Sequence, residues 1–178
     1  MRRCLCHHRG GWGRGSGVNG RLVGGILIGA ALLAGIAIYW LQVYAFYRDV
    51  PEAEAALTLT DRDGQVEPLV VGDFRAIDAS SSPIRFRACF RTRLTAQEVE
   101  RFAPYPGAEP LIAPRWFDCF DASAIGAALA SGAAKAFLGA AHPEGYDRVI
   151  ALYPDGRAYA WQQINPTFAR ETDARPAP

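Results

Sequence analysis

The stretch "RFRACFRTR", residues 85–93, indicates how the core of this protein is built. Arginine or cysteine stands at every odd position, and apolar or small residues stand between them. Because successive side chains of a β-strand point to opposite faces of the sheet, this period of two predicts a strand over residues 83–92. Its apolar face holds Ile84, Phe86, Ala88 and Phe90. Its other face holds Cys89 and four arginines, Arg85, Arg87, Arg91 and Arg93.

A second cysteine, Cys119, follows 30 residues later in "WFDCFD". Cys89 and Cys119 are the only cysteines after residue 21, and two such thiols in an oxidising compartment favour a disulfide. Closing a loop of this length would stabilise the fold by roughly 3–4 kcal/mol. We predict that bond, with the "WFDCF" aromatics covering the aliphatic stems of Arg87 and Arg91 and leaving their charged heads exposed.

Other uses of these residues stay open. Four neighbouring arginines would lower the pKa of Cys89 and favour a reactive thiolate, although the cysteines lack the C-x-x-C spacing of redox sites. Both thiols could also remain free. The arginine face is interpreted as a solvated sheet face, with an anion or acidic-partner patch at the same four arginines as the alternative. A metal site needs more ligands than two cysteines and the distant His142, so we expect neither a metal nor a cofactor.

Short elements around this strand predict an α+β domain over residues 56–165. Two strands joined by an Asp-Gly turn are expected within residues 56–71, and "DFRAID", residues 73–78, is expected to extend them. The stretch "KAFLGAA", residues 135–141, predicts a further strand. Residues 146–164 predict a C-terminal β-hairpin that turns at Pro154-Asp155-Gly156.

Two short helices are expected beside this mixed sheet. Thr95 and Glu98 form the pattern of a capping box, which opens a short helix. Asp121 or Ser123 caps a second helix, and Gly132 ends it. Four prolines within residues 104–114 predict an irregular crossing between the two helices.

The segment "LVGGILIGAALLAGIAIYWL", residues 22–41, runs for 20 residues without a charge. At a rise of ~1.5 Å per residue, a helix of this length spans about 30 Å, the thickness of a bilayer core. We predict a transmembrane helix over residues 22–44 and a linker over residues 45–55. Aromatic residues gather at its end, as in an interfacial belt: Tyr39, Trp40, Tyr44, Phe46 and Tyr47.

Flanking charges predict the orientation of this helix. Basic residues precede it, whereas Arg48, Asp49, Glu52 and Glu54 follow it, so the positive-inside rule places the N-terminus in the cytoplasm and the domain outside. A cleaved signal peptide is the alternative. The apolar run exceeds the ~7–15 residues of a signal core, and "YWLQVYAFY" offers no small-x-small cleavage site, which favours an uncleaved anchor.

Small residues in the helix would let two copies of it pack closely, so a homodimer through the helix stays open. These residues are Gly25, Gly29, Ala31 and Gly35.

Charge is distributed unevenly along the chain. Residues 1–21 carry five arginines and no acid, whereas the remainder holds 14 basic and 18 acidic side chains. A mildly acidic remainder disfavours nucleic acid as a partner. Residues 1–17 predict a disordered tail, because they are rich in glycine and arginine and their C-x-C-H-H pattern matches no standard zinc spacing. Residues 166–178 predict a second, flexible tail.

Sequence motifs of catalysis are missing: there is no G-x-S-x-G elbow, no P-loop and no dinucleotide-binding fingerprint. We therefore expect a membrane-anchored, non-catalytic module that binds or scaffolds another protein of the cell envelope. The alternative is a thiol-redox or assembly factor that acts through Cys89 and Cys119.

Four stretches, residues 19–47, 77–90, 113–132 and 146–165, together resemble a small, uncharacterised bacterial family with one N-terminal membrane helix. In a bacterium the predicted orientation means an inner-membrane helix and a periplasmic domain. Members of such families start near Val18, which implies that residues 1–17 are not translated. Some relatives carry the name histidine kinase, but these 178 residues show no ATP-binding domain. The resemblance implies no activity.

Overall fold

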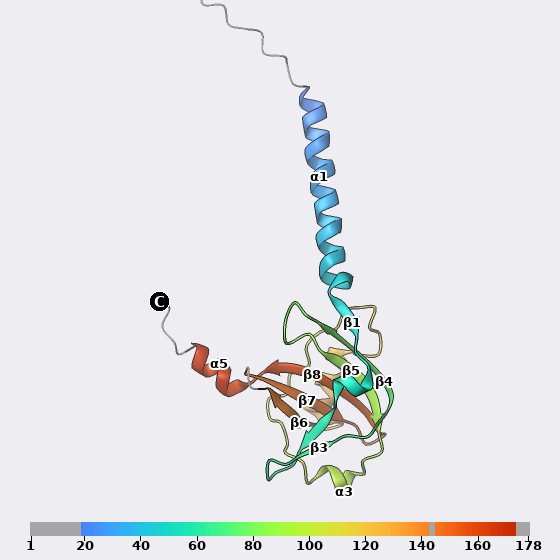
Figure 1. Ribbon diagram of the computed structural model, residues 1–178, viewed down its shortest axis with the longest axis vertical. Coiled ribbons are helices and arrows are strands. Elements are labelled where there is room, and N and C mark those ends of the chain that lie inside the picture. The colour runs from blue at the N-terminus through green and yellow to red at the C-terminus, as the bar shows by residue number, and fades with distance from the viewer. Residues whose placement is uncertain (1–18, 143–144, 174–178) are drawn as a thin grey trace, which may run out of the picture. The chain divides into compact units, whose positions relative to one another are not determined.

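Strand β5 (Arg87–Thr92) lies in the middle of an antiparallel sheet, and it coincides with most of the strand that the alternating sequence predicts. The computed structural model describes residues 19–142 and 145–173 (Figure 1). The chain divides into two compact units, residues 1–42 and residues 43–178.

Helix α1 (Gly20–Trp40) begins the described chain and continues into the π-helical turn η1 (Leu41–Ala45). Asn19 caps it, since its side chain accepts a hydrogen bond from the backbone N–H of Arg21 at 3.2 Å. Within the described residues, the segment Gly20–Ala45 is the one helix long and apolar enough to cross a membrane, with a mean hydropathy of 2.3. A signal sequence near the N-terminus would have the same length and apolar composition.

Six strands of the described chain form one antiparallel sheet in the order β1-β4-β5-β8-β7-β6. Beside β5 these are β1 (Tyr47–Asp49), β4 (Val71–Ala79), β6 (Lys135–His142), β7 (Tyr146–Leu152) and β8 (Arg157–Ile164). Strands β2 (Thr58–Thr60) and β3 (Val66–Pro68) form a separate pair. The short helices are α2 (Glu52–Ala55), α3 (Ala96–Val99), α4 (Ala122–Ser131) and α5 (Pro166–Asp173). This arrangement confirms the α+β class (Figure 1).

Apolar side chains cover both faces of the sheet. Ala88 and Phe90 of β5 belong to one buried cluster, whereas Cys89 belongs to a second one. Because neighbouring residues of a strand point to opposite faces, these clusters lie on opposite sides of the sheet. The second cluster includes Phe117, Phe120, Ile125 and Trp161. The interpretation of the Cys89 face as solvated is therefore wrong, because residues 117–125 cover it with a second core.

Local sequence signals place several element ends as predicted. Thr95 and Glu98 form the capping box of α3, and Asp121 caps α4 through bonds to two backbone N–H groups. Gly132 ends α4 in the left-handed conformation. The hairpin of β7 and β8 turns over residues 153–156, where Gly156 has a φ of 84°.

Residues 45–55, expected as a linker, instead contain β1 and α2. Tyr47 pairs with Ala79 of β4, and Val50 and Ala55 are buried. A three-residue strand is too short to show a period in the sequence, so only its pairing with β4 reveals it.

Two other segments differ from expectation. Residues 73–78 belong to β4 in the large sheet and do not extend the pair of β2 and β3. Residues 166–173, expected in a flexible tail, form α5, whose Phe168 ring lies 6.5 Å from that of Tyr146. The expected N-terminal tail and translation start, residues 1–17, lie outside the described residues.

Gly156→Ala should lower the free energy of unfolding by about 1–2 kcal/mol, because a left-handed conformation carries that penalty for a residue with a Cβ atom. The added Cβ would also lie 2.9 Å from the carbonyl oxygen of Thr92. Urea unfolding of the full chain in detergent micelles measures the change.

The matched control for this variant is Gly126→Ala in α4, where an added Cβ meets nothing within 4 Å. Alanine is the better helix former by roughly 1 kcal/mol, so this variant should be at least as stable as the parent. Equal unfolding midpoints for Gly156→Ala and Gly126→Ala would contradict the claim that the turn at Gly156 needs a residue without a Cβ atom.

Candidate functional site

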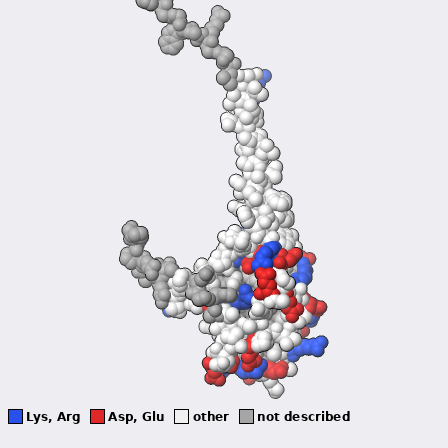
Figure 2. All heavy atoms as spheres, in the orientation of Figure 1, with Lys and Arg blue, Asp and Glu red and all other residues white. Residues whose placement is uncertain are grey.

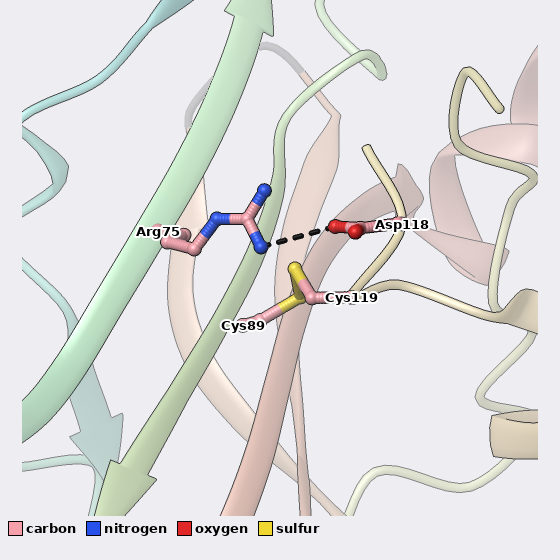
Figure 3. Close-up of a disulfide and its surroundings, with 4 residues drawn as sticks. All are labelled: Arg75, Cys89, Asp118 and Cys119. Carbon is pink, nitrogen blue, oxygen red and sulfur yellow. Dashed lines mark hydrogen bonds and ion pairs between the residues drawn. A yellow bond between two sulfur atoms is a disulfide. The ribbon is translucent and has the colours of Figure 1, made fainter. Parts of the chain in front are cut away.

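Cys89 and Cys119 form a disulfide with an S–S distance of 2.11 Å and a Cα–Cα distance of 6.3 Å (Figure 3). Strand β5 positions Cys89, and the residues before α4 position Cys119. Cys89 is only 8% exposed and lies in the second apolar cluster. The predicted bond is thus present in the structure, and it ties the irregular segment before α4 to the central strand.

An ion pair between Arg75 and Asp118 lies beside the two sulfur atoms (Figure 3). Nη1 of Arg75 donates to Oδ1 of Asp118 at 3.0 Å, and the guanidinium also lies 5.5 Å from the centre of the Phe117 ring. Both charged side chains are exposed, so the pair contributes little to stability. Sequence reasoning missed Arg75, because β4 and β5 are brought side by side only by sheet pairing.

Arg87 occupies the same face of β5 as Cys89, and it is 5% exposed. Its guanidinium donates to the backbone carbonyl oxygens of Phe86 at 2.7 Å, Ile84 at 2.8 Å, Leu111 at 2.8 Å and Ile112 at 3.4 Å. Burial lowers the pKa of Arg87 to about 10, so the side chain stays charged at neutral pH. The expectation that the charged head of Arg87 is exposed is therefore wrong. The head is buried because carbonyl oxygens of the irregular segment, those of Leu111 and Ile112, accept hydrogen bonds from it.

One expectation for this arginine does hold in part. The ring centre of Phe120 lies 5.8 Å from the Arg87 guanidinium, so an aromatic residue of "WFDCF" does pack on this arginine.

The other three arginines lie at the two ends of β5. Near the start, Nη1 of Arg85 donates to the Tyr47 hydroxyl at 3.4 Å. Near the end, Nε of Arg91 lies 3.6 Å from Oδ2 of Asp73, and Arg93 is exposed. Since the donors of Arg87 are occupied, the anion or acidic-partner patch stays a prediction for Arg85, Arg91 and Arg93.

A partly buried polar network holds the irregular crossing against the sheet. The hydroxyl of Tyr105 and the side-chain amide of Asn165 donate to Oδ2 of Asp147 at 2.9 and 2.8 Å. Burial first, and then the bond to Asp147, raise the pKa of Tyr105. Gln163 accepts from the backbone N–H of Glu109 at 2.9 Å. Sequence reasoning missed this network. The one sequence feature that points to it is the presence of the polar residues Asp147 and Gln163 inside the predicted hairpin strands.

Two clefts of the described chain open near the C-terminal end of β5. One of about 180 Å³ is mostly apolar and includes Leu94, Phe137 and Lys135. Another of about 590 Å³ is lined by Val70, Asp73, Arg91 and Arg93. No group of three or more His, Cys, Asp or Glu side chains that could hold a metal occurs among the described residues.

Cys89→Ser and Cys119→Ser should lower the free energy of unfolding equally. Each removes the same closure of a 30-residue separation, which is worth roughly 3–4 kcal/mol. Urea unfolding of the full chain without reductant measures both, and the double variant should match the single ones. Free, alkylatable Cys89 and Cys119 in protein from its native membranes would contradict the bond.

Comparison with known proteins places this chain in a family. No curated protein and no solved structure matches it. A family model described as "Family of unknown function (DUF6446)" matches residues 56–178, which include both cysteines and the elements from β2 to α5 but not α1. Because the match covers more than half of the chain, the protein belongs to this DUF6446 family of unknown function.

Proposed function

We propose that this protein is a single-pass anchor of the bacterial inner membrane whose periplasmic domain binds or scaffolds another envelope protein without catalysing a reaction. The observation that carries the proposal is the segment Gly20–Ala45, whose most apolar window has no residue buried inside the protein.

Large apolar side chains of α1 need a cover that the protein itself does not supply. Eight of them are 55–71% exposed: Leu22, Ile26, Leu27, Ile28, Leu32, Leu33, Ile36 and Ile38. Burying such a side chain is worth about 1.5–3 kcal/mol, so leaving all of them in water is strongly unfavourable. Figure 2 shows the helical segment almost free of charged atoms, whereas Lys, Arg, Asp and Glu gather on the domain. A bilayer core supplies the missing cover.

The disulfide supports an oxidising compartment for the domain. Bonds of this kind persist in the bacterial periplasm and are rare in the cytosol. The flanking basic residues support the same side, since residues 1–21 carry five arginines before the helix, whereas Arg48 is the one basic residue among Asp49, Glu52 and Glu54 after it. A cleaved signal sequence would deliver the domain to the same compartment, so the disulfide supports the location and not the anchor.

Val70 and its neighbours offer a surface for a protein partner. The Val70 side chain is 83% exposed, and it lines both the 590 Å³ cleft and a second cleft of about 290 Å³. Arg93 lines both clefts as well, and Arg91 lines the larger one. Acidic side chains line these clefts too, Asp73 and Asp155 in one and Glu67 and Glu98 in the other, so Val70 suits a partner that presents an apolar residue among charges of both signs.

Two further roles have less support. A second helix could pack on Gly25, Gly29, Ala31 and Gly35, because an added Cβ at each of these three glycines meets nothing within 4 Å. A thiol-redox role needs accessible sulfur, whereas Cys89 is buried among Phe117, Phe120 and Trp161.

Membrane insertion should leave residues 19–45 in the mature protein. We expect the chain to stay in the membrane fraction after carbonate extraction, and mass spectrometry to find intact α1. Alkaline phosphatase fused after Pro178 should be active, because this enzyme needs disulfides that form outside the cytoplasm. A soluble product that begins after residue 45 would overturn the anchor, and an inactive phosphatase would overturn the orientation.

A photo-crosslinking amino acid at Val70 should capture a protein partner in intact cells, and the same residue at Ala127 of α4 should not. Ala127 is also exposed, so it controls for chance collisions. Arg91→Glu combined with Arg93→Glu should abolish the adduct, because the charge at both arginine positions is reversed. An adduct that survives this reversal, or no adduct at Val70, would contradict the partner surface.

A further inference from the structure

We propose that the loop of residues 111–116 docks on the bilayer surface, with Ile112 and Trp116 in the lipid headgroup region. This inference rests on the proposed function in one respect, namely that the segment Gly20–Ala45 spans a membrane.

A hydrogen bond fixes the position of this loop along the chain. Nε1 of Trp116 donates to the backbone carbonyl oxygen of Val43 at 2.9 Å. Val43 lies in the same compact unit as the loop, and it also belongs to the last turn of the apolar segment. If that segment spans the bilayer, its last turn reaches the headgroup region, and the bond holds Trp116 at the same depth.

Aromatic side chains surround this point. The ring of Trp116 stacks on that of Tyr44 at 6.3 Å and meets the edge of Tyr47 at 5.7 Å. Phe46 is exposed beside them in the sequence. Tryptophan and tyrosine are enriched at membrane–water interfaces, where one end of the ring is apolar and the other is hydrated.

Ile112 is a second exposed apolar residue of the same loop. It is 84% exposed, although the backbone on either side of it is well anchored. Arg87 donates to the carbonyl oxygens of Leu111 and Ile112, and Phe117 is buried in the second cluster. These contacts therefore fix the backbone of the loop, while the side chain of Ile112 remains exposed.

The charges next to the loop suit a bilayer with anionic lipids. Arg115 is exposed within the loop, and the Arg85 guanidinium lies 5.5 Å from the ring centre of Tyr47. Basic side chains near a membrane surface attract anionic headgroups. An apolar tip beside interfacial aromatics thus fits a lipid surface better than it fits an acidic protein.

The test places a photo-crosslinking amino acid at Ile112 of the full chain in nanodiscs of phosphatidylethanolamine and phosphatidylglycerol. We expect a phospholipid adduct at this position by mass spectrometry. Val70 is the matched control, since it is an equally exposed apolar residue at 83% against 84%. The lipid adduct should be several-fold more abundant at Ile112 than at Val70.

Two changes sharpen the result. Trp116→Phe keeps an aromatic ring but removes the bond to Val43, so it should reduce the adduct at Ile112. Replacing phosphatidylglycerol by phosphatidylcholine should reduce it further. An intact Cys89–Cys119 bond on a non-reducing gel reports that each variant is folded. Arg115 provides a second position for the crosslinker in the same loop.

The outcomes separate this inference from the proposed function. A chain that does not enter nanodiscs overturns the anchor and, with it, the docked loop. A chain that enters them but gives no adduct at Ile112, or gives equal adducts at Ile112 and Val70, overturns the docked loop and leaves the anchor standing.

Discussion

The burial of the Arg87 guanidinium among backbone carbonyl groups is the interaction on which the rest of the domain depends. Irregular backbone has no strand ladder to satisfy its polar groups, and buried groups left unpaired destabilise a fold. Arg87 supplies donors to Leu111 and Ile112, and it keeps its charge because burial lowers its pKa only to about 10. Two residues further along the same face of β5, Cys89 binds the same irregular segment covalently through Cys119. Strand β5 thus holds the irregular segment at two places. Hydrogen bonds from Arg87 hold it at Leu111 and Ile112, and the disulfide from Cys89 holds it at Cys119.

The crossing in turn creates the second core. Tyr105 and Asp147 fix its beginning, Gln163 fixes Glu109, and Phe117 and Phe120 close it over Trp161. The sheet is therefore covered on both faces. This arrangement explains how a domain of modest length buries a residue as large as Trp161 completely. The same arrangement makes the disulfide part of the core, which favours a structural over a redox role for it.

Surfaces that remain open then carry the functional interpretation. Val70 and Ile112 are the two most exposed large apolar side chains of the described domain, and each has arginines nearby. They differ in their surroundings. Ile112 lies in the loop whose Trp116 donates to Val43 in the last turn of the apolar segment, which suits a lipid surface. Val70 lines two clefts, which suits a protein. Under the two proposals, this domain would meet a membrane and a partner protein through different sites.

The sequence by itself determined the features that rest on local interactions. The period of two in residues 85–93, the capping box at Thr95, the cap at Asp121 and the turn at Gly156 each involve residues close along the chain. The apolar helix follows from composition, and the pairing of Cys89 with Cys119 follows from their being the only cysteines after residue 21. Tertiary structure alone decided that Arg87 is buried, that residues 47–49 add a strand, and that β4 joins the large sheet. The physical reason is that these outcomes depend on partners far away in the sequence, since nothing near Arg87 announces the carbonyl groups of Leu111 and Ile112.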